Sequence, residues 1–274
     1  MLSESFALFQ QEGFLARSSL LAGLNALRKA NIDDTNKGLF YSAFFELSIG
    51  FERLMKLVLV INHMAKNDLH PMTDQELKNK YGHKIESLYK SCKELNDSLG
   101  RPNDDFYAEG TFEWEIIHFL HEFALSARYY NLSKLTNGQR TNDPLSDWWS
   151  LLTQVIHRDV TNKKLEKIQS DSLAYCDNFA GNSFTMMRGL DGQLMTTLDA
   201  VMYPQLVDAA APHMVWHVFK IISPFYFLIS DVVKAAHEIE HSKRVNHPNI
   251  PYMYEFFPFF LLDRSDVIRR RKWG

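Results

Sequence analysis

The sequence predicts an all-α protein, and three observations support this prediction. Its 274 residues include 12 Gly and 9 Pro, which is few of the breaks that a turn-dense β protein needs. Apolar side chains recur at helical spacing over most of the chain. No series of segments alternates apolar and polar residues in the way that would build a sizeable sheet. A hydrophobic content of 46% is ordinary for a globular protein with a substantial core.

The first half of the chain reads as consecutive helices. Residues 4–30 carry apolar side chains at helical spacing, and we expect one helix there with a break near Gly13. Residues 38–66 have the broadest apolar face and form the strongest helical pattern in the sequence. A Thr-Asp-Gln-Glu run from Thr73 is a capping-box pattern that should start a short helix. The remaining helices of this half are expected at residues 73–80, 83–96 and 113–135.

A turn-rich stretch at residues 136–144 separates the two halves. We therefore expect a helical bundle at residues 1–137 and an additional helical region at residues 138–274 that packs on it. Proline residues break a Phe-rich segment near the end of the chain, before a last short basic helix. The long helical patterns of this second region are at residues 145–157, 163–179, 184–207 and 213–242.

Charge and cysteine content limit the classes of function. The 30 Lys plus Arg and 33 Asp plus Glu leave a net charge of −3, so the chain has no overall basic field for nucleic acid. The basic run Arg269–Trp273 reads as a solvated tail. Cys92 and Cys176 are isolated and suit a reducing compartment, so we expect a cytoplasmic protein.

We expect no contact with a membrane. The first residues of the chain have no basic segment leading into an apolar one, which is unlike a signal peptide. The longest apolar run, residues 215–233, is interrupted by His217, Lys220 and Asp231. Because a membrane span would bury these charges, this run predicts a buried helix.

Residues 237–247 contain the pattern H-E-x-x-H, which in zinc proteases places two imidazoles on one helical face. In a zinc protease His237 and His241 would bind the metal, Glu238 would activate its water, and His247 would be a third ligand. Arg244 stands where a glycine would allow the chain to turn back toward the metal. The pattern therefore keeps zinc as an alternative and does not favour a metal.

A second metal hypothesis uses paired E-x-x-H patterns, which build di-iron and di-manganese sites in helical bundles. Glu115 with His118 forms one such pair, and Glu238 with His241 forms the other. Two further carboxylates on separate helices would be required. This hypothesis makes the protein a metal-dependent enzyme that binds iron or manganese.

Three stretches of the first half resemble a known family. They are FYSAFFELSIGFERLMKLVLVINH at residues 40–63, YGHKIESLY at residues 81–89, and FLHEFALSARYYNL at residues 119–132. In pattern and order, residues 38–135 resemble the prokaryotic branch of the HEPN superfamily of helical bundles. The resemblance implies an all-α bundle that forms a homodimer, takes part in bacterial defence or toxin systems and acts on RNA. It also implies an antitoxin or another defence protein as a partner.

The resemblance also implies an activity, because many HEPN proteins look like metal-independent endoribonucleases. Their motif is an arginine followed four to six residues later by a histidine. No such pair occurs in this sequence. The candidates at matching regions are His121 and Arg128, with His83 before the second helix. On one continuous helix His121 and Arg128 would lie two turns apart on one face. The alternatives are an ion pair of Arg128 with Glu122 and a packing role for His121.

The loss of that motif favours a degenerate family member with a regulatory, nucleotide-sensing or interaction role. We therefore expect an RNA-associated or regulatory component of a defence or toxin system. A metal-dependent enzyme and a purely structural interaction protein remain alternatives.

Overall fold

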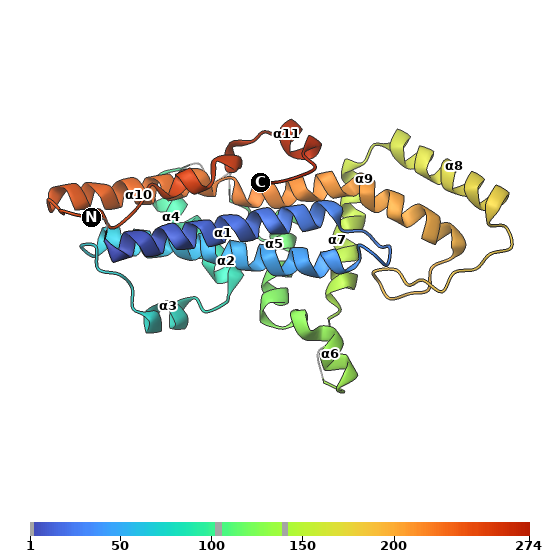
Figure 1. Ribbon diagram of the computed structural model, residues 1–274, viewed down its shortest axis with the longest axis horizontal. Coiled ribbons are helices and arrows are strands. Elements are labelled where there is room, and N and C mark those ends of the chain that lie inside the picture. The colour runs from blue at the N-terminus through green and yellow to red at the C-terminus, as the bar shows by residue number, and fades with distance from the viewer. Residues whose placement is uncertain (1–2, 102–105, 139–141) are drawn as a thin grey trace.

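A computed structural model describes residues 3–101, 106–138 and 142–274 (Figure 1). The described residues are helical apart from turns, loops and one isolated β-bridge between Arg188 and Leu194. This confirms the predicted all-α class. Among the described residues, no helix combines the length and the apolarity needed to cross a membrane.

Two long antiparallel helices, α1 (Glu4–Lys29) and α2 (Gly38–Lys66), run side by side along the long axis (Figure 1). Two glycines bring their backbones close together. A Cβ at Gly23 would lie 2.7 Å from Leu47 Cγ, and a Cβ at Gly50 would lie 2.8 Å from Leu20 Cγ. Both predicted helices are confirmed, but the break expected near Gly13 was wrong. That glycine is helical and buried, and it lets the Phe256 ring approach α1.

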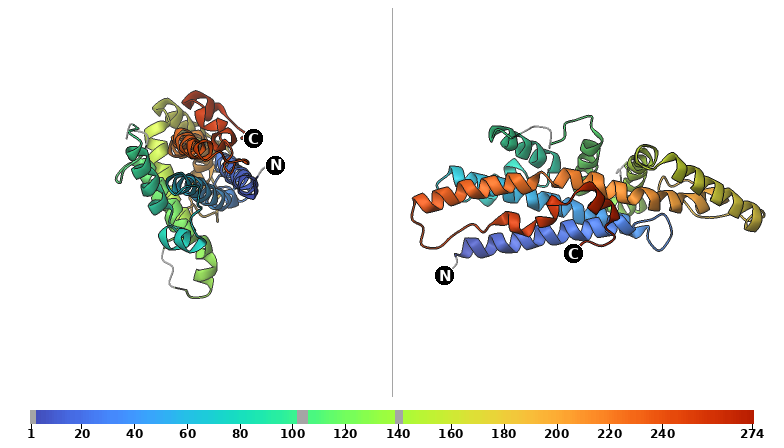
Figure 2. Two further views of the ribbon diagram at one scale, coloured as in Figure 1. Left: turned by 90° about the vertical axis from the view of Figure 1, so that its left-hand side faces the viewer. Right: turned by 90° about the horizontal axis from the view of Figure 1, so that it is seen from above.

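The helices α9 (Thr197–Ile222) and α10 (Phe225–Ser242) complete the bundle, with α9 against α1 and α10 against α2 (Figure 2). The single helices expected over residues 213–242 and 215–233 were wrong. The chain breaks at Ser223 and Pro224, where the proline lacks the N–H that a continuous helix would need. Both flanks of this break are buried, as the apolar pattern predicted.

Short helices cross one side of the bundle. The predicted capping box is confirmed in α3 (Asp74–Lys80), where Thr73 and Glu76 exchange hydrogen bonds. The helix expected over residues 113–135 was wrong, because it ends at Ser126, whose backbone is not helical. The chain continues as η2 (Ala127–Tyr129) and α6 (Tyr130–Leu135), and α6 projects away from the bundle (Figure 1). Two further helices of this side are α4 (Ile85–Ser98) and α5 (Phe112–Leu125).

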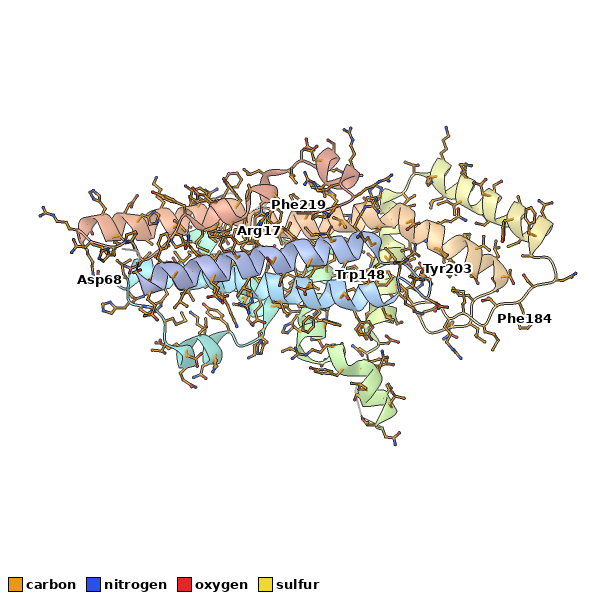
Figure 3. All side chains as sticks on the ribbon, in the orientation of Figure 1. Arg17, Asp68, Trp148, Phe184, Tyr203 and Phe219 are labelled. Carbon is orange, nitrogen blue, oxygen red and sulfur yellow. The ribbon has the colours of Figure 1, made fainter. Side chains whose placement is uncertain are left out.

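Two helices lead from this side to the far end of the molecule. They are α7 (Pro144–Asp159) and α8 (Asn162–Phe179). The helix expected over residues 184–207 was wrong in its first half, because residues 181–196 form an irregular loop. Gly192 has a φ of +76°, and a second capping box between Thr196 and Asp199 starts α9 only at Thr197. Phe184 lies in this loop at the end of the molecule and is exposed (Figure 3).

The C-terminal segment returns along the bundle instead of forming a solvated tail. Trp273 is 2% exposed and lies against Phe219 and Phe259. The Asn25 side chain donates to the carbonyl of Trp273 and accepts from its N–H. The expectation that Arg269–Trp273 forms a solvated tail was therefore wrong for Trp273. The segment contains η3 (Met253–Phe256), η4 (Pro258–Leu261) and the short helix α11 (Arg264–Arg269), as the proline pattern predicted.

Buried apolar residues from both predicted regions form one continuous core. Trp148 of α7 is fully buried and packs on the rings of Phe44 and Phe119 (Figure 3). The division at residues 137 and 138 stays a prediction. Of the turn-rich linker, residues 139–141 lie outside the described residues.

Candidate functional site

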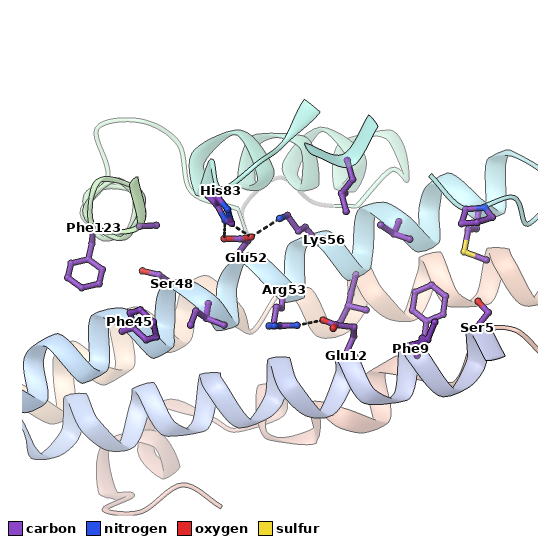
Figure 4. A pocket seen from close by; sticks show the side chains of 18 of the residues that line it. Ser5, Phe9, Glu12, Phe45, Ser48, Glu52, Arg53, Lys56, His83 and Phe123 are labelled. Carbon is purple, nitrogen blue, oxygen red and sulfur yellow. Dashed lines mark hydrogen bonds and ion pairs between the residues drawn. The ribbon is translucent and has the colours of Figure 1, made fainter. Parts of the chain in front are cut away.

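A groove of about 940 Å³ opens on the side of the α1–α2 pair that faces α3 (Figure 4). Four parts of the chain line it: the first turns of α1, one face of α2, the segment around α3, and the end of α5 with η2. We call this cavity the groove. Its lining residues are Glu4, Ser5, Leu8, Phe9, Glu12, Phe45, Ser48, Ile49, Glu52, Arg53, Lys56, Leu57, Val60, Met64, Pro71, Leu77, His83, Phe123, Ala124 and Arg128.

Helical spacing explains which side chains of α1 and α2 reach the groove. Residues three, four, seven and eight apart share one helix face, and the α2 lining from Phe45 to Met64 follows this spacing. The segment around α3 is held over the groove by turns at both of its ends. Asp68 and Leu69 have φ values of 55° and 67° before α3, and Gly82 has a φ of 51° after it.

The wall of the groove is mainly apolar, and part of it is open to solvent. Phe45 is 44% exposed and Leu8 is 56% exposed. A concave site with apolar walls and a few polar groups is typical of small-molecule binding sites.

Ion pairs cross the middle of the groove (Figure 4). The guanidinium of Arg53 donates to Glu12 at 2.5 Å and joins α2 to α1. The Lys56 ammonium lies 2.6 Å from Glu52, and His83 Nδ1 lies 3.0 Å from the same carboxylate. Glu52 therefore links Lys56 of its own helix, α2, to His83 in the segment between α3 and α4.

Arg128 lines the groove from η2. Its guanidinium carbon is 5.4 Å from the centre of the Tyr129 ring. Among the described residues Arg128 forms no ion pair, and this includes the expected pair with Glu122. It is therefore a cation whose charge the described part of the protein does not neutralise.

The structure brings together two of the three residues predicted for a ribonuclease site. His83 and Arg128 both line the groove. His121 does not line it, and its buried Nδ1 has no hydrogen-bond partner among the described residues. Because α5 ends at Leu125, His121 and Arg128 do not share the continuous helix face that the sequence predicted.

The residues of the two E-x-x-H pairs have separate partners. His118 Nδ1 lies 2.6 Å from Glu86, and Glu115 accepts a hydrogen bond from Gln154. The other pair lies on α10, which does not belong to this side of the bundle. Within the described ranges, no three His, Cys, Asp or Glu side chains converge as metal ligands would. The iron, manganese and zinc hypotheses stay predictions.

The H-E-x-x-H stretch holds the chain reversal after α10. His237 Nε2 donates to the carbonyl oxygen of Ile250 at 2.7 Å, and Glu240 accepts from the N–H of Asn249 at 2.6 Å. Arg244 has a φ of 50°, so the left-handed turn that glycine would favour is made by an arginine. In this arrangement Nε2 of His237 is hydrogen-bonded to the backbone and does not face a shared metal position with His241.

A buried charged cluster, which no sequence pattern indicated, joins α5, α7 and α9. His217 Nδ1 lies 2.7 Å from Glu113, while its Nε2 lies 3.0 Å from Asp159 and 2.8 Å from Arg158. Lys220 also donates to Glu113. These residues are far apart in the sequence and match no spacing rule, so no local signal could have found them.

The cluster changes the acidity of both carboxyl groups. Burial by itself raises the pKa of Glu113, but hydrogen bonds from His217 and Lys220 outweigh it and lower the pKa to about 2. Burial also raises the pKa of Asp159, yet its bond to His217 and the nearby Arg158 lower it overall. Both groups are therefore carboxylates at neutral pH, and they hold three helices together.

The chain matches no protein-family model, no curated protein and no solved structure.

Proposed function

We propose that this protein is a HEPN-like regulatory component of a bacterial defence or toxin system, which binds RNA or a nucleotide in the groove. The observation that carries the proposal is the groove itself, a mainly apolar cavity whose lining includes both His83 and Arg128. Apolar and aromatic walls suit bases, and cations suit phosphate. A homodimer and an antitoxin or another defence protein as partner belong to the same proposal.

The positive and negative charges of the groove balance, so we expect no strong electrostatic attraction of RNA or nucleotide. Three carboxylates, from Glu4, Glu12 and Glu52, stand beside three permanent cations, from Arg53, Lys56 and Arg128. Binding would therefore depend on shape and on Arg128, which has no ion pair with any residue that the structure describes. We expect moderate affinity and a modest dependence on salt.

The test measures fluorescence anisotropy of the full chain with a labelled single-stranded RNA hexamer and with labelled mononucleotides. We expect Arg128→Ala to weaken binding about tenfold or more, because it removes a charge-assisted contact to phosphate. Lys134→Ala is the matched control, since Lys134 carries the same charge on α6 and does not line the groove. Equal losses in both variants, or no binding at all, would contradict the proposal.

A second candidate function is metal-independent cleavage of RNA, and the geometry of His83 favours it. Glu52 accepts a hydrogen bond from Nδ1 of His83, while Nε2 has no hydrogen-bond partner among the described residues. A carboxylate that orients an imidazole in this way is a common arrangement for a general acid or base. Arg128 would stabilise the negative charge that develops on the phosphate.

The cleavage candidate is tested with excess EDTA present, on RNA labelled at its 5′ end. We expect products that end in a 2′,3′-cyclic phosphate and a loss of about 100-fold or more in His83→Ala. Intact RNA after prolonged incubation with the folded protein would leave binding alone as the proposed function. Cleavage that persists in His83→Ala would place the reactive group elsewhere.

A further inference from the structure

We propose that the end of the chain and the end of α1 together form a docking surface for an acidic segment of a partner protein. We call it the basic surface. It consists of six cations: Arg28 and Lys29 of α1, and Arg269, Arg270, Arg271 and Lys272 at the end of the chain. None of the six lines the groove. Docking at the basic surface is therefore independent of the proposed function.

The structure holds the basic run at residues 269–272 against the bundle. Before the run, Val267 of α11 is buried, and after it Trp273 is 2% exposed. Trp273 exchanges two hydrogen bonds with Asn25 of α1, at 2.7 and 2.8 Å. Arg28 and Lys29 lie three and four residues after Asn25 on the same helix, one turn further along it. The end of the chain thus lies beside the last turns of α1 (Figure 1).

The electrostatics of Arg28 show that the two parts of the basic surface act on each other. Burial lowers the pKa of Arg28, Asp208 opposes this effect, and the positive charge of Arg271 lowers the pKa further. The buried Nε of Arg28 has no hydrogen-bond partner among the described residues. Because two guanidinium groups held near each other repel, an anion that contacts both is favoured there.

The protein does not neutralise these charges. Within the part of the chain that the structure describes, none of the six cations forms an ion pair. Two carboxylates act on them from a greater distance, Asp208 on Arg28 and Asp263 on Arg269. Asp263 also accepts a backbone N–H as the cap of α11. The basic surface is therefore a local excess of positive charge on a chain whose net charge is −3.

The kind of cation indicates the kind of partner. Four of the six residues are arginines. A guanidinium presents a planar fork of N–H donors that pairs with both oxygens of a carboxylate. The four residues of the basic run span at most about 13–14 Å, so an acidic segment of about four to six residues would cover it.

Nucleic acid and an anionic membrane fit the basic surface less well. Proteins that bind single strands offer open aromatic rings on which bases stack. The ring next to the basic run, that of Trp273, is buried, and the guanidinium of Arg270 lies 5.3 Å from its centre. Asp266 and Arg269 share a helix face, so a flat membrane that reached the arginine would also meet an exposed carboxylate. A narrow peptide can avoid that carboxylate.

The experiment measures fluorescence anisotropy of the full chain with labelled hexaglutamate, and with labelled hexaglutamine as the neutral probe. We expect hexaglutamate to bind about tenfold or more tightly than hexaglutamine, and to bind more weakly as the salt concentration rises. Arg271→Gln/Lys272→Gln should lower the affinity for hexaglutamate about tenfold or more, because it removes two charge-assisted contacts. The matched control is Lys163→Gln/Lys164→Gln, which removes two exposed lysines of α8 and should bind as the wild type does.

Two single variants locate the binding. Lys29→Gln changes an exposed residue of α1 and should weaken binding about threefold or more, because the surface combines α1 with the end of the chain. A basic tail that bound by itself would not respond to this change. Arg128→Ala should leave the affinity for hexaglutamate unchanged, since Arg128 belongs to the groove.

Four results would overturn the docking surface. Equal losses in the two double variants would mean a general attraction between charges, and an unchanged affinity in Lys29→Gln would mean that α1 takes no part. If vesicles of phosphatidylserine or an RNA hexamer bind through Arg271 and Lys272 and hexaglutamate does not bind, the class of partner is wrong. If hexaglutamate, vesicles and RNA all fail to bind there, the basic run is only solvated. RNA binding that depends on Arg128 would still support the proposed function in each case.

Discussion

Replacing Gly50 by alanine tests the close packing of α1 on α2. A new Cβ at this position would lie 2.8 Å from Cγ of Leu20 and 3.0 Å from its backbone nitrogen. The Leu20 side chain could rotate away, but its backbone could not. The two helices would therefore have to move apart along an interface that is buried on both sides.

Two opposing effects determine the size of the change. Alanine in place of glycine inside a helix stabilises it by about 1 kcal/mol. Forcing an extra methyl group into a closely packed interface costs about 1–3 kcal/mol. Because the backbone contact leaves little room for relaxation, we expect the second effect to dominate. The free energy of unfolding should fall by about 1 kcal/mol, with a lower melting temperature by about 2–4 °C.

Gly38→Ala is the matched control, because it lies on the same helix and a Cβ there meets nothing within 4 Å. Urea denaturation followed by circular dichroism would compare both variants with the wild type. We expect Gly38→Ala to be neutral or slightly stabilising. If Gly50→Ala stabilises the protein as Gly38→Ala does, then α1 and α2 do not approach as closely as described, and the packing argument is refuted.

Three further predictions concern other parts of the molecule. Trp273→Ala should lower the free energy of unfolding by about 3 kcal/mol and expose the C-terminal segment to limited proteolysis, because the indole is buried in the core; an unchanged urea midpoint would contradict this. Glu113 stabilises the fold most at pH values above its ordinary pKa of 4.5, and this contribution of about 3 kcal/mol should be lost as the pH falls toward about 2. The comparison is with Glu113→Gln, whose stability should vary less over that interval; parallel curves would count against the assignment. His237→Ala should lower the free energy of unfolding by about 1–2 kcal/mol, because it removes the hydrogen bond to Ile250, and it should leave the metal content unchanged. One zinc per chain in the wild type and none in the variant would contradict this and support the zinc hypothesis.

The sequence by itself was sufficient for the helices whose limits depend on local interactions. Residues 38–66 form α2 as expected, because their apolar spacing repeats without interruption. The capping box at Thr73 was equally readable, since a cap involves only neighbours three residues apart. Where the local pattern continued across a break, as at Ser126 and Ser223, the prediction of a single helix was wrong. Periodicity reports which side chains are apolar and does not report where the backbone turns.

The candidate site was readable only in part. His83 and Arg128 could be named from the family resemblance, but the groove that contains both depends on how α1, α2, η2 and the segment around α3 pack together. The charged cluster around His217 could not be predicted from the sequence, because its members lie far apart along the chain. Asp159 follows Glu113 by 46 residues, and His217 follows Asp159 by 58 residues. Local sequence determines the helices through interactions between near neighbours. Only the tertiary structure decides which of their polar side chains meet, because that depends on the burial of apolar faces that lie far apart along the chain.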